Sequence, residues 1–173
     1  MAKGVVLEIG IGSGLNLPHY DTEKVSKIIG VDPDDHIWKL GTTRRNECQV
    51  DIERIGLSGE KIPLEDNLVD SVVCTYTLCT IPDPVKALHE MRRILKPGGQ
   101  ILFTEHGKAP DEKIYNKQVK MDRWWSKIAG GCHTSRDIPG LFTEAGLNMN
   151  SLETMYLPGG PKTLGFNYWG SAA

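Results

Sequence analysis

The feature that most constrains this chain is a glycine-rich turn directly after its first apolar segment. The turn reads GIGSG over residues 10–14 and follows the continuous apolar run Val5–Ile9. A carboxylate, Asp32, follows the next apolar segment, Lys27–Val31. Alternating glycines let a ligand approach the backbone closely, and an acid at the end of the neighbouring strand can bind ribose hydroxyls. The pattern predicts a nucleotide-like ligand at the edge of a parallel sheet.

The spacing of the glycines separates two kinds of nucleotide ligand. The dinucleotide fingerprint G-x-G-x-x-G would need a glycine at position 15, where this chain has Leu15. Glu8, two residues before the first glycine, would repel a diphosphate but tolerate an ammonium or a sulfonium. A nicotinamide-dependent reductase is therefore the less favoured alternative. For Glu8 itself two roles stay open, contact with the ligand or hydrogen bonds to the glycine loop.

The turn resembles the first motif of the class I S-adenosylmethionine-dependent methyltransferases, and Asp32 matches their ribose-binding acid. A structural alternative for Asp32 is a helix cap or a turn. The resemblance implies S-adenosylmethionine as the cofactor. The candidate cofactor-binding residues that it implies are Glu8, Gly10, Gly12, Gly14, Asn16, Asp32, Pro33, Gly59, Glu60 and Thr75.

The middle of the chain extends the resemblance over nearly all of residues 5–142. The stretch at residues 59–64 is similar to the segment before the fourth strand of small-molecule methyltransferases, where Gly59 and Glu60 would lie near the adenine. Residues 88–99 are similar to the family's helix and turn before its fifth strand. A closer similarity to the group that includes the thiol S-methyltransferases rests on residues 73–79, 104–106, 122–125 and 131–134.

The secondary-structure pattern alternates strands and helices, which is typical of a doubly wound, mostly parallel Rossmann-like α/β sheet. The expected strands are Val5–Ile9, Lys27–Val31, Val50–Ile55, Leu68–Thr75 and Gln100–Thr104. The expected helices are Asp35–Asn46, Asp83–Leu95 and Asp137–Ala145. Two final strands, Met149–Leu157 and Thr163–Trp169, flank a Pro-Gly-Gly-Pro segment and should form a C-terminal antiparallel hairpin.

The bulk properties indicate one domain over residues 1–173 without a membrane span. The chain is 39% hydrophobic and 24% charged, with a net charge of −2, which argues against a nucleic-acid partner. No apolar run reaches membrane-spanning length, so we expect a cytoplasmic protein. The cysteines form no C-x-x-C pair and are expected to be free thiols: Cys48, Cys74, Cys79 and Cys132.

The first strand begins almost at Met1, whereas most methyltransferases of this class carry helices ahead of it. We therefore expect a class I methyltransferase fold that lacks the N-terminal helices. Their lack should leave part of the sheet or the mouth of the site exposed. This predicts either a homodimer or a loosely held cofactor.

The expected reaction is methyl transfer to a small, apolar acceptor. The loop at residues 75–79 lacks the Asn/Asp-Pro-Pro-Tyr motif of enzymes that methylate nucleic-acid bases. A thiol is the favoured acceptor because its ordinary pKa of about 8.5 requires no strong base. The alternatives are a non-catalytic cofactor-binding module and a lipid or amine N- or O-methyltransferase.

His106 is the candidate catalytic residue because it follows the fifth expected strand, where sites of such sheets open. It could act as a general base, orient the acceptor, or simply bond to backbone. Asp122 and His133 are weaker candidates. His106, Cys132 and His133 match no standard metal-ligand spacing, so no metal site is expected.

A helix over Lys113–Ile128 would place five basic residues along one side and an apolar stripe beside them. The basic residues are Lys113, Lys117, Lys120, Arg123 and Lys127, and the stripe is Ile114, Met121, Trp125 and Ile128. Basic residues beside tryptophan suit peripheral contact with an anionic membrane. A solvated face over an ordinary core stripe is the alternative.

Overall fold

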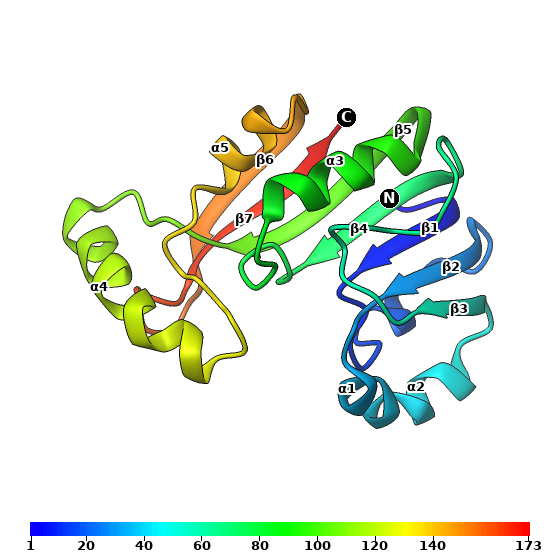
Figure 1. Cartoon of the computed structure of the whole chain (residues 1–173), viewed down its shortest axis with the longest axis horizontal. Helices are drawn as coiled ribbons and strands as arrows, with labels where there is room; N and C mark the ends of the chain where they lie inside the picture. Colours follow the sequence, from blue (N-terminus) through cyan, green and yellow to red (C-terminus); the bar gives the residue numbers. More distant parts are fainter.

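The computed structural model describes all residues 1–173 and contains one seven-stranded sheet (Figure 1). The strands are β1 (Gly4–Ile9), β2 (Val25–Val31), β3 (Asp51–Ile55), β4 (Val69–Thr75), β5 (Leu95–His106), β6 (Met149–Tyr156) and β7 (Phe166–Ala172). Their order is β3-β2-β1-β4-β5-β7-β6. The first five strands are parallel, and β7 is antiparallel to both β5 and β6. The predicted parallel sheet with a C-terminal antiparallel hairpin is confirmed.

The helices are α1 (Asp35–Leu40), α2 (Thr42–Glu47), α3 (Pro84–Ile94), α4 (Glu112–Ile128) and α5 (Ile138–Glu144), with a short 3-10 helix η1 (Leu17–His19). Helix α3 begins as predicted: the Asp83 side chain accepts a hydrogen bond from the Lys86 N–H at 3.0 Å. In Figure 1, α3 and α5 cover one face of the sheet, whereas α4 projects beyond its edge. None of the helices combines the length and apolar character needed to span a bilayer.

Three predicted elements differ from the structure. The strand expected over Gln100–Thr104 is longer, because β5 runs from Leu95 to His106. The single helix expected over Asp35–Asn46 is broken at Gly41 into α1 and α2. A Cβ at Gly41 would lie 2.4 Å from the Ser13 carbonyl oxygen, so this glycine lets the two helices pack against the glycine turn. The last strand begins at Phe166 rather than Thr163, because the Leu164 N–H bonds to the Pro161 carbonyl and extends the turn.

The two faces of the sheet are covered unequally. A cluster of 25 buried hydrophobic residues lies on the face that α3 and α5 cover. The second cluster contains only six: Val6, Ile11, Leu17, Val25, Ile28 and Val50. Farther along this second face, Val73, Leu102 and Trp169 are only half-buried and line an open depression of about 210 Å³. The predicted exposure of part of the sheet is therefore observed.

The strand register brings the predicted site residues to one edge. Ile9 at the end of β1 pairs with Val31 of β2 and with Cys74 of β4. Strands β4 and β5 also end close together, because Thr75 pairs with Thr104. The strand order reverses between β1 and β4, which is the position where open parallel sheets bind ligands.

Candidate active site

The glycine turn is pressed against the loop that follows β4. Gly10 has a φ of +74°, and a Cβ there would lie 2.1 Å from Thr77 Oγ1. The same hydroxyl donates a hydrogen bond of 3.1 Å to the Ile9 carbonyl oxygen. A side chain at position 10 would separate the two loops, so the glycine is required by both conformation and space.

Asp32 both shapes the turn and borders the adjoining cavity. Its Oδ2 accepts a hydrogen bond from the Gly12 N–H at 2.9 Å, and its Oδ1 accepts one from the Asp34 N–H at 2.8 Å. The carboxylate remains half-buried at the cavity wall. Asp32 thus has the structural role in a turn that was its alternative. Each carboxylate oxygen still has a free lone pair for a ligand.

Two adjoining cavities collect most of the predicted cofactor residues. The larger, of about 490 Å³, is lined by Gly10, Asp32, Pro33 and Gly59 among others. The smaller, of about 230 Å³, is lined by Glu8, Gly10, Gly12, Asn16 and Thr75 among others. Gly10 and Ile37 border both cavities, so the two lie on either side of the glycine turn.

Two predicted cofactor residues do not line either cavity. Gly14 has a φ of +72°, and a Cβ there would lie 2.6 Å from Leu17 Cδ1, so its role is in the turn. Glu60 accepts hydrogen bonds from Ser58 Oγ at 2.7 Å and from the Asp83 N–H at 2.8 Å. It therefore links the loop before β4 to the start of α3.

Glu8 is buried at the wall of the smaller cavity. It accepts hydrogen bonds from Tyr20 Oη at 2.7 Å and from Asn16 Nδ2 at 3.0 Å. Burial raises the pKa of Glu8 to about 7, although both hydrogen bonds oppose this shift. The carboxylate thus bonds to side chains rather than to the backbone of the glycine turn, and it has a position next to a potential ligand.

The loop after β4 is held by Glu105, a buried residue at the end of β5. Glu105 Oε1 accepts hydrogen bonds from the Thr77 N–H at 2.7 Å and from the Leu78 N–H at 2.9 Å. Tyr76 in this loop has a positive φ of 50° and lines the smaller cavity. Its hydroxyl donates a 2.7 Å hydrogen bond to Asn167 Oδ1, which fixes the ring against β7.

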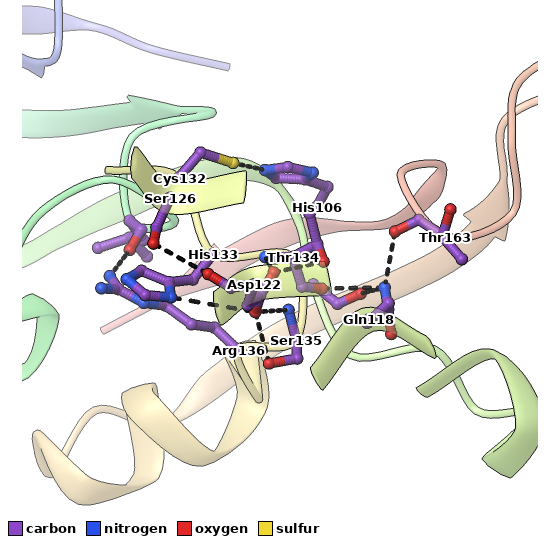
Figure 2. A network of polar contacts seen from close by, with 12 residues as sticks. His106, Gln118, Asp122, Ser126, Cys132, His133, Thr134, Ser135, Arg136 and Thr163 are labelled. Atoms are coloured by element: carbon purple, nitrogen blue, oxygen red, sulfur yellow. Dashed lines mark hydrogen bonds and ion pairs between the residues drawn. The ribbon is translucent and has the colours of Figure 1, made fainter. Parts of the chain in front are cut away.

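His106 lies behind this loop and is paired with a cysteine (Figure 2). Its Nε2 is 3.2 Å from Cys132 Sγ, and its ring meets the Tyr76 ring edge-to-face at 5.9 Å. Burial alone would lower the pKa of His106, but the bond to Cys132 and the charge on that sulfur outweigh it and raise the pKa. The pKa of Cys132 is lowered to about 4. A hydrogen bond with Cys79 is the main cause, and the contact with His106 adds to it, whereas burial acts in the opposite direction. His106 itself does not line either cavity; it contacts Tyr76, which does.

The buried face of α4 is polar. Gln118 and Asp122 are its buried residues, whereas the expected apolar stripe is half-buried at Ile114, Met121 and Trp125 and exposed at Ile128. Within the stripe, Ile114 packs against the main hydrophobic cluster, so the core-stripe alternative holds only at that position. The chain segment that packs on the rest of α4 presents backbone groups that need partners. Gln118 bonds to four backbone groups: Ala109 N–H, Gly107 C=O, Thr134 C=O and Thr163 C=O.

Asp122 anchors the segment that carries Cys132 (Figure 2). It accepts four hydrogen bonds of 2.7–3.0 Å from the N–H and hydroxyl groups of Thr134 and Ser135. Burial would raise the pKa of Asp122, but these four bonds lower it. With its carboxylate fully engaged, Asp122 positions a loop. His133, the other weak candidate, has its Nδ1 4.0 Å from Asp122 Oδ2.

Sequence reasoning missed four residues that the structure places at the site. Tyr76 and Thr77 shape the cavity, Gln118 fixes α4, and Arg136 donates hydrogen bonds to the carbonyl oxygens of Leu78 and Ile81. No local pattern identifies them. Their roles depend on loops that meet only in the folded chain.

The residues that line the two cavities suit S-adenosylmethionine. A glycine cradle that a Cβ would fill lies between them, an acid suited to ribose hydroxyls borders one, and a buried acid suited to an ammonium borders the other. The fold shares this architecture with solved methyltransferases. An S-adenosylmethionine-dependent methyltransferase of Methanosarcina mazei superimposes with a TM-score of 0.77 at 20% identity, covering 99% of this chain and 92% of that one. A putative methyltransferase of Bacillus halodurans superimposes with a TM-score of 0.76 at 15% identity, with coverages of 99% and 92%.

These likenesses define a class I methyltransferase fold. Residues 7–103 match the family described as "Methyltransferase domain". The chain is also 33% identical to thiol S-methyltransferase TMT1B of Rattus norvegicus over 169 residues, which is 92% of this chain and 68% of the relative. The Homo sapiens TMT1B is 32% identical, with coverages of 94% and 70%. The chain belongs to this methyltransferase family and is an S-adenosylmethionine-dependent enzyme, which removes the nicotinamide-dependent and non-catalytic alternatives.

Proposed function

We propose that this enzyme transfers the methyl group of S-adenosylmethionine to a small, apolar acceptor, and that thiols are its preferred acceptors. The observation that carries the proposal is the His106–Cys132 pair behind Tyr76, whose ring lines the smaller cavity. An imidazole whose pKa is raised, as that of His106 is by its bond to Cys132, favours an anionic acceptor such as a thiolate. The names of the rat and human relatives, thiol S-methyltransferases, agree with this preference.

In this proposal the two cavities divide the cofactor between them. Asp32 bonds to the ribose hydroxyls and Gly59 lies against the base in the larger cavity. Glu8 faces the ammonium group in the smaller cavity, and Gly10 lets the ligand cross the turn. When bound, S-adenosylmethionine supplies a methyl group on a positively charged sulfur.

The acceptor side requires little acid–base chemistry for a thiol. Because its ordinary pKa is about 8.5, a modest stabilisation of the anion produces the thiolate, and the proton leaves to solvent. The acceptor sulfur then forms the new bond to the methyl carbon, while the electron pair of the broken bond remains on the cofactor sulfur. His106 therefore orients and stabilises the acceptor rather than removing its proton, since its ring already bonds to Cys132.

The test combines binding with turnover. Calorimetric titration with S-adenosylhomocysteine should give one site, and methyl transfer should then be measured with alkyl thiols, amines and phenols in parallel. We expect thiols to have the highest kcat/KM. A higher kcat/KM for an amine or a phenol would refute the acceptor class while leaving the cofactor assignment intact.

The remaining expectations concern partners and location. Homodimerisation, the absence of a nucleic-acid partner and a cytoplasmic location stay predictions. Light scattering of the purified protein, gel-shift titration with duplex DNA and RNA, and cell fractionation test them one by one.

A further inference from the structure

Three side chains that can ligate a metal meet beside the acceptor side of the site. They are Cys79 from the loop after β4, His106 from the end of β5, and Cys132 from the segment after α4. Their ligand atoms all lie within 4.8 Å of one another, and Cys132 Sγ is 3.2 Å from His106 Nε2. Cys79 is buried, whereas the other two residues are half-buried, so the cluster has a protected side and an accessible side.

The chemistry of this donor set is selective. Two thiols and one imidazole suit zinc and other thiophilic cations, whereas calcium and magnesium take oxygen ligands. In a tetrahedral zinc site the ligand atoms lie about 3.5–3.8 Å apart, from metal–ligand distances of about 2.0–2.3 Å. The ligand atoms of the cluster, which lie within 4.8 Å of one another with one pair at 3.2 Å, are close to this spacing.

The fold holds the three residues through contacts that leave their ligand atoms free. The His133 N–H donates a 2.8 Å hydrogen bond to the Cys79 carbonyl oxygen, which joins the two cysteine loops. Gly131 has a φ of +91°, and a Cβ there would lie 3.2 Å from the Thr80 carbonyl oxygen, so the loops approach closely. Asp122 fixes the residues that follow Cys132 (Figure 2).

The spacing of histidines and cysteines along the sequence suggested a different group of candidate ligands and predicted no metal site. It grouped His133 with His106 and Cys132, but His133 lies beside Asp122 and is not part of the cluster. Cys79 takes its place because the loop after β4 folds back toward β5. The residues that meet in the tertiary structure are therefore not the ones whose spacing argued against a metal site.

We propose that Cys79, His106 and Cys132 bind a zinc-class divalent cation whose open fourth position takes the acceptor thiolate. This rests on the proposed thiol acceptor and deepens it. A site with three protein ligands and one open position is the catalytic type of zinc site. Thr80 and Gly131, the neighbours of two ligands in the chain, line the larger cavity, and Tyr76 lines the smaller one.

The step that the cation would assist balances without an added reagent. A thiol that coordinates the cation gives up its proton to solvent and is held as the thiolate. Its sulfur forms the bond to the methyl carbon, and the electron pair of the broken bond stays on the cofactor sulfur. The product is a neutral thioether, a weaker ligand than the thiolate, and it leaves the cation.

The binding test uses the full chain, reduced and stripped of metal, without cofactor or acceptor. Zinc is titrated in competition with a chromophoric chelator, and cobalt(II) is added separately to detect thiolate-to-metal charge-transfer absorption. We expect one equivalent of either metal. Cys132→Ser and His106→Asn should weaken zinc binding by about 100-fold or more, and Cys48→Ser, a half-buried cysteine outside the cluster, should have no effect.

Cys79 is buried, so its variant needs a fold check and an independent measurement. Cys79→Ser is compared with the wild type by S-adenosylhomocysteine affinity. In the wild type, zinc should protect Cys79 and Cys132 from alkylation, read by mass spectrometry, and leave the alkylation of Cys48 unchanged. Binding of less than about 0.1 equivalent of zinc, or equal loss in Cys48→Ser, would overturn the site.

The acceptor role is tested separately from the methyl transfer. Adding an alkyl thiol to the cobalt protein should shift the charge-transfer band, whereas the methyl thioether should not. An unchanged spectrum, or full thiol methylation by the chelated enzyme, would overturn the role of the cation and leave the thiol methyltransferase standing. A shifted band without methylation of any thiol would support the site and refute the proposed function.

Discussion

The cofactor side and the acceptor side of this site are built in different ways. The cofactor side consists of a turn that continues directly from β1 and an acid that ends β2, joined by a 2.9 Å hydrogen bond from Gly12 N–H to Asp32. The proposed acceptor side collects one residue each from three separate segments, and Cys132 and His106 are 26 positions apart. The cofactor side, whose residues are close in sequence, depends on backbone conformation. The acceptor side, whose residues are distant in sequence, depends on the contacts between the segments that carry them. Changes on one side should therefore leave the other side working.

The largest effect is expected at Gly10. In Gly10→Ala the positive φ and the overlap with Thr77 Oγ1 both displace the turn, and S-adenosylhomocysteine affinity should fall by about 100-fold or more. Calorimetry measures the loss. Gly98→Ala is the matched control, because Gly98 also has a positive φ of 80° but nothing within 4 Å. Equal losses in the two variants would mean that strain alone, not the contact with the β4 loop, explains the effect.

Asp32 should have the next largest effect. Asp32→Ala removes a charged partner of the ribose hydroxyls, and cofactor affinity should fall by about 10-fold or more, since hydrogen bonds to charged groups contribute about 1.5–3 kcal/mol. Asp32→Asn keeps an acceptor for the Gly12 N–H and separates the two roles. Wild-type affinity in Asp32→Ala would refute the assignment, and zinc binding should be unchanged in both variants.

Glu8 should make folding stability depend on pH. In the folded protein its pKa is about 7, whereas an unfolded glutamate has a pKa of about 4.3, so the folded state binds more protons between these values. Stability should therefore fall as the pH rises through this window, by about 3–4 kcal/mol. Urea unfolding of Glu8→Gln should lack this fall.

Glu23→Gln, at an exposed position, is the control for Glu8. If Glu8 faces the cofactor ammonium, binding of S-adenosylhomocysteine below pH 7 should release a proton in the wild type and not in Glu8→Gln. Calorimetry in buffers of different ionisation enthalpy detects it. No proton release would place the ammonium elsewhere.

Asp122 should affect only the acceptor side. In Asp122→Asn an amide NH2 group replaces one carboxylate oxygen and meets two of the four hydrogen-bond donors. Those hydrogen bonds are lost, which loosens the Cys132 loop. Methyl transfer to an alkyl thiol should fall by about 10-fold in kcat/KM, while cofactor affinity stays within about twofold. A matching loss of cofactor affinity would show that the two sides are coupled.

The smallest effect concerns the exposed face of α4. Trp124 and Ile128 are 53% and 71% exposed beside the basic residues. If this face contacts membranes, the protein should co-sediment with anionic vesicles at low salt. In Lys117→Glu the free energy of vesicle binding should weaken by about 1 kcal/mol for the lost basic residue. Lys61→Glu, also exposed, is the control. An absence of binding to anionic vesicles would eliminate the membrane contact.

Much of the fold could be predicted because its signals are local. The apolar runs of β1 and β4, the Asp83 cap of α3 and the turn of the final hairpin each occupy a few consecutive residues. The break at Gly41 was missed because its cause, the carbonyl of Ser13, is distant in sequence. The same reason explains the polar face of α4, where Gln118 serves backbone groups of other segments.

The sequence by itself determined the parallel sheet, the glycine turn and the acid that follows β2, because strand periodicity and turn chemistry act between near neighbours. Only the tertiary structure decided that Gly14 and Glu60 lie away from the cavities and that Cys79 joins His106 and Cys132. Those contacts depend on how separate loops pack at the sheet edge, and no spacing along the chain encodes that distance.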